Sequence, residues 1–159
     1  MSPLAVIALL LLTGNSLLGK EFFVCLEDQS RMFGSDFELY KRLLRSAAGN
    51  RGMVLTFSCR ATDAIRITIA HEPFQEEPSA LGATRVAFGR LLPEVYVFRG
   101  AIRRTLSSTL PVLEVRAMVL VALHELQHFA DQRQDHDHDG IFSSSLGRVQ
   151  LLAWSRDYR

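Results

Sequence analysis

Apolar residues recur at intervals of three and four positions between Asp36 and Ala48. This period predicts an amphipathic helix, which Ser35 or Asp36 can cap and which Gly49-Asn50 ends. Its apolar face would consist of Phe37, Tyr40, Leu43, Leu44 and Ala47.

Four shorter stretches have patterns typical of strands. Residues 53–57 form an apolar run with β-branched members, and residues 64–70 alternate, with three isoleucines opposite Arg66 and Thr68. The alternation predicts a strand that is buried on one face only. Val86 to Phe88 and Glu94 to Phe98 are the other two expected strands. Two prolines and three glutamates make residues 71–78 a loop.

A longer apolar stretch from Pro111 to about Gln132 predicts a helix that is buried on most faces, with Pro111 in its first turn. A short helix near Val149 to Trp154 would follow it. The order of a helix, several strands and a buried helix indicates an α+β domain.

The first 19 residues contain no Lys, Arg, Asp or Glu, and Leu4 to Leu12 is an unbroken apolar run. Nine apolar residues are too few to span a bilayer as a helix and match the core of a signal peptide. Residues 1–19 are therefore expected to be a signal peptide, with an uncleaved membrane anchor as the alternative. Residues 20–159 would form one domain that is secreted or periplasmic.

Composition excludes several classes of protein. With 18 Lys and Arg against 17 Asp and Glu, the net charge is +1, which argues against binding to nucleic acid by bulk charge. Two cysteines rule out a disulfide-rich scaffold and a four-cysteine zinc site. Export would permit a Cys25–Cys59 disulfide, and two unpaired buried cysteines remain the alternative.

His124, Glu125 and His128 form an HExxH pattern near the end of the buried helix. Residues four apart lie on one helix face, so both imidazoles can bind one zinc ion. Glu125 could take the proton from a water that the zinc acidifies, and that water would attack a carbonyl carbon. HExxH alone is moderately specific, and its place on a buried helix strengthens the interpretation.

A catalytic zinc needs a third protein ligand, and no glutamate follows Glu125. Asp131 lies one turn beyond His128 and could either bind the metal or orient a histidine. The other downstream candidates are Asp135, His136, Asp137, His138 and Asp139.

The stretch from His124 through His128 and His136 to Gly140-Ile141-Phe142 resembles the metzincin-type zinc metallopeptidases. More narrowly, it is similar to small secreted peptidases of environmental bacteria that place a longer loop before the third histidine. This resemblance implies a metzincin-like domain, in which a small twisted mixed sheet packs on an N-terminal helix and a buried active-site helix. It also implies Zn²⁺ as the cofactor and a peptide or protein as the substrate.

The same resemblance assigns His124, His128 and His136 as zinc ligands and Glu125 as the general base, with His138 as the competitor for the third position. Residues 80–98 would form the edge of the sheet on the substrate side, where an extended peptide could add as a strand. Within that segment, Glu94 to Phe98 resembles the edge strand.

Two other functions stay open. Phe142 stands where the family has a methionine. This replacement also fits an inactive zinc-binding or interaction domain. The run from Asp135 to Asp139 would suit a metal-sequestering protein. Charged residues elsewhere are interpreted as solvent-exposed: Arg99, Arg103 and Arg104 on a helix face, Glu72, Glu76 and Glu77 in a loop, and His71 at a strand end.

Overall fold

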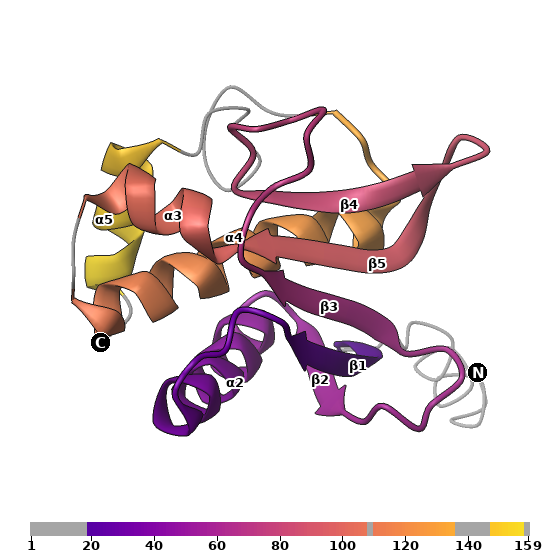
Figure 1. The fold of residues 1–159 in the computed structure, drawn as a ribbon. Coiled ribbons are helices and arrows are strands. Elements are labelled where there is room, and N and C mark those ends of the chain that lie inside the picture. Colours follow the sequence, from indigo (N-terminus) through magenta and orange to yellow (C-terminus); the bar gives the residue numbers. More distant parts are fainter. Residues whose placement is uncertain (1–18, 108–109, 136–146, 158–159) are drawn as a thin grey trace, which may run out of the picture.

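The structure is a computed structural model that describes residues 19–107, 110–135 and 147–157, without the side chains of residues 154–157. The expected leader, His136, His138 and Phe142 lie outside the described residues. The strands are β1 (Lys20–Asp28), β2 (Met53–Phe57), β3 (Ile65–Ala70), β4 (Gly82–Ala87) and β5 (Arg90–Phe98). The helices are α2 (Gly34–Gly49), α3 (Arg99–Leu106), α4 (Pro111–Asp131) and α5 (Arg148–Asp157) (Figure 1).

The five strands form one mixed sheet in the order β2-β1-β3-β5-β4. β1, β2, β3 and β5 run parallel, and β4 pairs antiparallel with β5 at the edge. An α/β or α+β domain with a mixed sheet packed against helices is therefore observed, as the element order predicts.

β1 is an inner strand that the hydrophobic pattern did not reveal. Val24 is fully buried and pairs with Phe57 on one side and Ile65 on the other. Phe23 beside it is 45% exposed, so an apolar residue occupies the outer face and obscures the alternation. β3 differs from expectation in a similar way, since Thr68 is buried although the alternation placed it towards solvent. Inner strands of parallel sheets are commonly covered on both faces.

β4 and β5 form a longer hairpin than the sequence suggested. The turn consists of Phe88 and Gly89, whose positive φ angles of 51° and 72° suit a two-residue hairpin loop. Phe88 thus lies in the turn and not in a strand. Glu94 to Phe98 was wrongly expected to be the edge strand: it belongs to β5, which pairs with both β3 and β4. β4 forms the edge.

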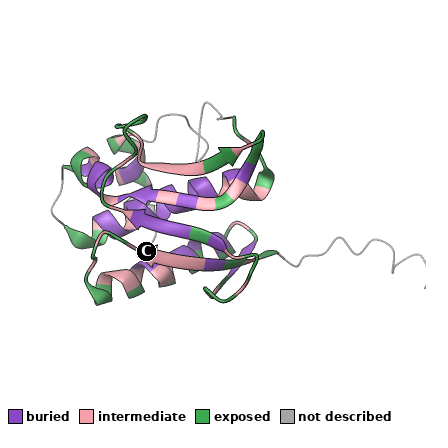
Figure 2. Ribbon diagram, turned by 45° about the vertical axis from the view of Figure 1, so that its right-hand side comes forward, coloured by how far each residue is buried: buried purple, intermediate pink, exposed green. Residues whose placement is uncertain are grey.

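α2 and α4 pack against each other and against the sheet, and their contact faces form the core (Figure 2). Tyr40, Leu44, Met118 and Leu123 are fully buried there. α2 begins two residues earlier than its sequence signals, after Phe33, with no side-chain cap, so the expected caps Ser35 and Asp36 are wrong. Pro111 opens α4 as expected, and α4 is buried along most of its length.

One residue of the expected basic patch, Arg99, is half-buried against another helix. Arg99 is only 14% exposed and pairs with Glu114 of α4, whose side chain is 7% exposed. Arg103 bonds to the same carboxylate at 3.1 Å, while Arg104 pairs with Glu72 near the surface. Packing of α4 buries the carboxylate of Glu114, and a buried charge needs a partner of opposite charge, which the two arginines provide. The interpretation of Arg99 as solvent-exposed is therefore wrong.

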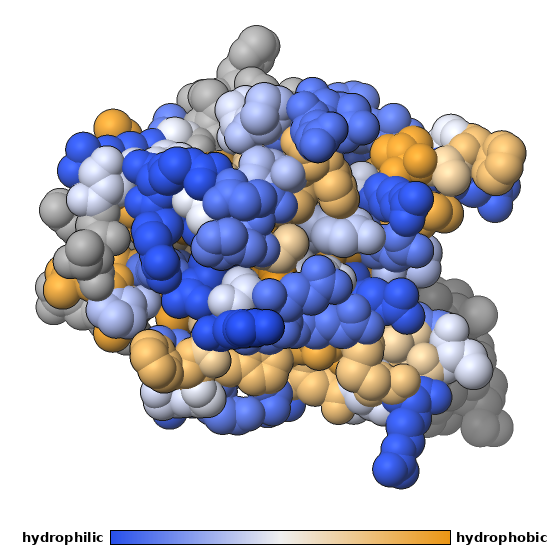
Figure 3. All heavy atoms as spheres, in the orientation of Figure 1, coloured by the Kyte–Doolittle hydropathy of each residue, from blue (hydrophilic) through white to orange (hydrophobic). Residues whose placement is uncertain are grey.

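Cys25 in β1 and Cys59 after β2 form a disulfide, with 4.4 Å between their Cα atoms. The bond ties β1 to the segment that follows its neighbour β2. No helix in the described part of the chain is long and apolar enough to cross a membrane. Hydrophilic side chains dominate the view in Figure 3, and apolar atoms gather at the tip of the β4–β5 hairpin, where Phe88 is fully exposed.

Candidate metal and catalytic site

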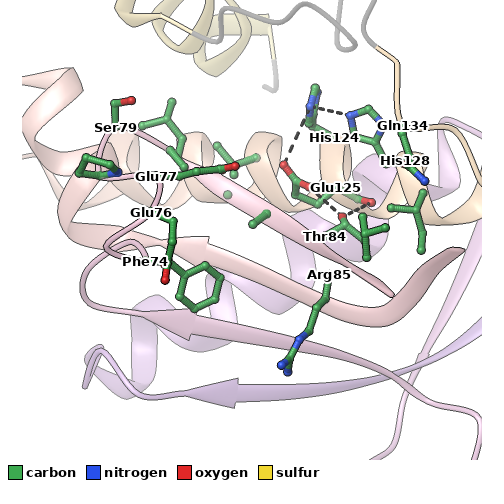
Figure 4. Close-up of a pocket in the computed structure, with 18 of the residues that line it drawn as sticks. Phe74, Glu76, Glu77, Ser79, Thr84, Arg85, His124, Glu125, His128 and Gln134 are labelled. Carbon is green, nitrogen blue, oxygen red and sulfur yellow. Dashed lines mark hydrogen bonds and ion pairs between the residues drawn. The ribbon is translucent and has the colours of Figure 1, made fainter. Parts of the chain in front are cut away.

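His124, Glu125 and His128 lie together on α4, close to its C-terminal end. All three are buried, with 4%, 8% and 5% of their surface exposed. Histidines four residues apart project from the same helix face. Their Nε2 atoms are 3.0 Å apart, and the two rings meet edge-on, with 80° between their planes (Figure 4). Two nitrogens bound to one tetrahedral zinc ion are roughly 3.3 Å apart, so small side-chain movements bring both within bonding distance.

The end of α4 holds the ring of His128. The Nδ1 atom of His128 lies 2.6 Å from the carbonyl oxygen of Arg133. A carbonyl oxygen only accepts hydrogen bonds, so Nδ1 carries the proton and Nε2 keeps its lone pair for a metal or another donor. Such a hydrogen bond commonly orients a metal-binding histidine.

The turn that brings Arg133 to His128 is a Schellman motif. Gln132 is left-handed, with φ 49° and ψ 39°. Its backbone N–H donates to the carbonyl oxygen of Phe129, and that of Arg133 donates to His128. These two bonds satisfy the last helical carbonyls and reverse the chain. Arg133 therefore contacts His128 through both its N–H and its carbonyl group.

Asp131 does not take the role that its spacing suggested. Its carboxylate accepts hydrogen bonds from Gln127, at 2.7 Å, and from Lys20, at 3.4 Å. The acceptor that orients His128 is a backbone carbonyl two residues further on. Asp131 as a ligand or as the orienting residue is thus not supported by the geometry, because its side chain lies on the β1 side of the helix.

Glu125 is held by a residue from the opposite wall. Its Oε2 lies 2.7 Å from the hydroxyl oxygen of Thr84 in β4, and its Oε1 lies 4.0 Å from Nε2 of His124. Burial raises the pKa of Glu125 to about 7; the Thr84 hydrogen bond opposes this shift, and the nearby charge of Glu77 adds to it. A carboxyl group whose pKa lies near neutrality can take up and return a proton.

These side chains open into a cleft of about 960 Å³ between β4, the loop before it and α4 (Figure 4). Glu76 and Glu77 line it, so these loop residues border the site. Gly82 permits the close packing of strand on helix, since a Cβ there would lie 2.5 Å from Cγ1 of Val121 and 3.1 Å from Cγ of Glu125. Gln134 and Gly147 also line the cleft, so the chain leaves and re-enters the described residues at its rim.

The third expected ligand, His136, and its competitor His138 belong to residues 136–146, outside the described part. Within the described ranges, no group of three His, Cys, Asp or Glu side chains is placed to hold a metal ion. His71 lies elsewhere, with its side chain 67% exposed beside Glu72, as expected for a surface residue.

Sequence reasoning missed Thr84 and the carbonyl group of Arg133. Thr84 lies 41 positions before Glu125, and nothing in its local pattern distinguishes it from other strand threonines. A backbone carbonyl carries no sequence signal at all. Both partners depend on how the hairpin and the end of α4 fold around the HExxH segment.

Comparisons with family models, with curated proteins and with solved structures found no match to this chain. Its function must therefore be inferred from the site itself.

Proposed function

We propose that this chain is a zinc-dependent peptide-bond hydrolase of the metzincin-like type, with His124, His128 and His136 as the zinc ligands and Glu125 as the general base. The observation that carries the proposal is the pair of buried imidazoles, whose Nε2 atoms are 3.0 Å apart beside a buried carboxyl group. Imidazole nitrogens suit Zn²⁺, and the hydrogen bond to the Arg133 carbonyl fixes the tautomer of His128 in which Nε2 carries the lone pair that would bind the metal.

A bound zinc ion would acidify a water molecule and polarise the carbonyl group of the substrate. The protein would supply the proton transfer. Glu125 is held 4.0 Å from Nε2 of His124, so it can take the proton from the attacking water and return it to the leaving amine.

The third ligand would come from the segment between Gln134 and Gly147. Gln134 and Gly147 both line the cleft that the two histidines line. His136 is two residues beyond Gln134, which places its backbone within ~7 Å of that residue. His138 is the alternative.

The edge strand β4 supports a peptide as the substrate. It runs along the cleft and pairs only with β5 among the described strands. An extended peptide can add to such an edge through main-chain hydrogen bonds. A mixed sheet, a packed N-terminal helix and an HExxH helix beside the edge strand are also what a metzincin-like fold would contain. Export to an oxidising compartment is proposed on the Cys25–Cys59 disulfide and the apolar N-terminal run.

The test is metal content and peptide cleavage by the purified domain from Lys20 onward. The wild type should hold one zinc per chain and cleave unstructured peptides, and Glu125→Gln should keep the zinc but lose cleavage. His136→Ala should lose zinc, and His138→Ala should retain it. Absence of zinc after reconstitution would overturn the proposal. Zinc without cleavage would leave an inactive zinc-binding domain.

A further inference from the structure

The contact between Thr84 and Glu125 links the edge strand to the proposed base. The Thr84 hydroxyl oxygen lies 2.7 Å from Oε2 and 3.1 Å from the carbonyl oxygen of Glu125. A hydroxyl is one donor with two acceptor lone pairs, so it can bond to the side chain and remain against the backbone of the same residue. Thr84 therefore contacts Glu125 at both its carboxyl group and its backbone carbonyl group.

The orientation of Glu125 depends on this contact. A glutamate side chain has three rotatable bonds, and holding Oε2 restricts the positions that the other oxygen can take. Oε1 is then the atom that faces Nε2 of His124, at 4.0 Å. Misplacement of a catalytic group by about 1 Å can lower a rate by roughly 100-fold.

The local structure of β4 directs Thr84 towards the helix. Gly82 and Thr84 are two residues apart and so lie on the same face of the strand, towards α4. The neighbours of Gly82 leave no room for a side chain at that position. Thr84 is therefore the residue on this face whose polar group reaches Glu125. The regular pairing of β4 with β5 shifts between Thr84 and Val86, and the extra residues of this β-bulge lie in β5, between Leu91 and Val95.

We propose that Thr84 is a positioning residue for Glu125, so that the strand expected to bind the peptide also orients the base. This inference rests on the proposed function. It adds that peptide binding and proton transfer depend on the same strand. Thr84 is part of β4, where the peptide would bind, and its hydroxyl group contacts Glu125.

The test compares Thr84→Val, which keeps the shape and removes the hydroxyl, with Thr84→Ser, which keeps the hydroxyl. Thr68→Val is the matched control, since Thr68 is a buried threonine of the same sheet. Zinc content, kcat and KM for a peptide, and crystal structures of the metal-free proteins would be measured for each. Thr84→Val should lower kcat by roughly 10- to 100-fold with little change in KM, and all variants should keep their zinc.

The structures provide a readout that does not need activity. In Thr84→Val the Glu125 carboxyl group should leave its wild-type position, while in Thr84→Ser and Thr68→Val it should stay. Wild-type kcat in Thr84→Val, a change in KM alone, or an unmoved Glu125 would overturn the positioning role. If the wild type binds zinc and cleaves nothing, the hydrolase proposal fails, and the position of Glu125 in these structures still decides the role of Thr84.

Discussion

The carbonyl oxygen of Arg133 lies 2.6 Å from Nδ1 of His128, and the backbone N–H of Arg133 donates to the carbonyl oxygen of the same histidine. Arg133, two positions past the last residue of α4, thus both ends the helix and orients the imidazole ring of His128. The arrangement depends on Gln132, which adopts the left-handed conformation that glycine or asparagine usually provides.

Replacing Gln132 with glycine should stabilise the protein. Glycine adopts a positive φ without steric cost, so Gln132→Gly should raise the free energy of unfolding by about 0.5–1 kcal/mol, with zinc content unchanged. Chemical denaturation measures the change. Gln127→Gly is the matched control: Gln127 lies inside α4, where the same substitution should lower the free energy of unfolding by about 1 kcal/mol. Equal losses at both positions would contradict this account of the turn.

The stability of the metal-free protein should depend on pH through Glu125. Burial raises its pKa to about 7 in the folded state, above the ordinary value of 4.5 that the unfolded chain retains. Below pH 4.5 both states hold the proton and the contribution to stability is complete. As the pH rises from 4.5 towards 7, Glu125 loses its proton in the unfolded chain but keeps it in the folded state. The free energy of unfolding therefore falls, by about 3 kcal/mol in all.

Urea denaturation between pH 4 and 8, with a chelator present, would measure this effect. Glu125→Gln has no proton to lose, so its free energy of unfolding should change less over the same range. Parallel pH profiles for the two proteins would show that Glu125 ionises normally in the folded state.

Gly82 sets the distance between β4 and α4. A Cβ at this position would lie 2.5 Å from Cγ1 of Val121 and 3.0 Å from the carbonyl oxygen of Tyr96. Gly82→Ala should therefore push the strand from the helix, lower the free energy of unfolding by about 1–3 kcal/mol and weaken peptide cleavage. Gly34→Ala is the control, because a Cβ at Gly34 meets nothing within 4 Å. Wild-type stability in Gly82→Ala would show that the strand can shift freely.

The disulfide should stabilise the domain without shaping the site. Cys25 and Cys59 are 34 positions apart, and the loop they close contains α2 and β2 but none of β4, β5 and α4. Replacing both with serine should lower the free energy of unfolding by about 3–4 kcal/mol, most of it through a less restricted unfolded chain. Zinc content of the folded fraction should not change. Loss of zinc at temperatures where the variant is still folded would indicate that the disulfide loop and the metal site are coupled.

The HExxH segment could be predicted from sequence because its spacing and its helix are both local. His124, Glu125 and His128 are brought together by the period of one helix. β2 was predicted with its observed bounds, and β3 and α4 to within one residue, for the same reason. The third ligand, His136, stays a prediction.

The edge strand could not be predicted, because strand order depends on contacts between distant segments. Glu94 to Phe98 has the stronger strand pattern since it is inner and buried, whereas β4 is half exposed and has a weaker one. The turn at Phe88-Gly89 lacks the Asn-Gly or Asp-Gly pair that usually signals such a hairpin. Arg99 was misplaced because its partner Glu114 is 15 positions away on another helix.

The two distances from Thr84 have a dynamic consequence. One hydroxyl proton faces two acceptors, Oε2 at 2.7 Å and the Glu125 carbonyl oxygen at 3.1 Å. When Glu125 is a carboxylate, the proton points to Oε2; when Glu125 is a carboxylic acid, its own proton can point to the threonine oxygen, whose hydrogen turns to the carbonyl. Rotation about a single Cβ–Oγ1 bond then serves both charge states. A proton can enter and leave this glutamate while strand and helix stay where they are.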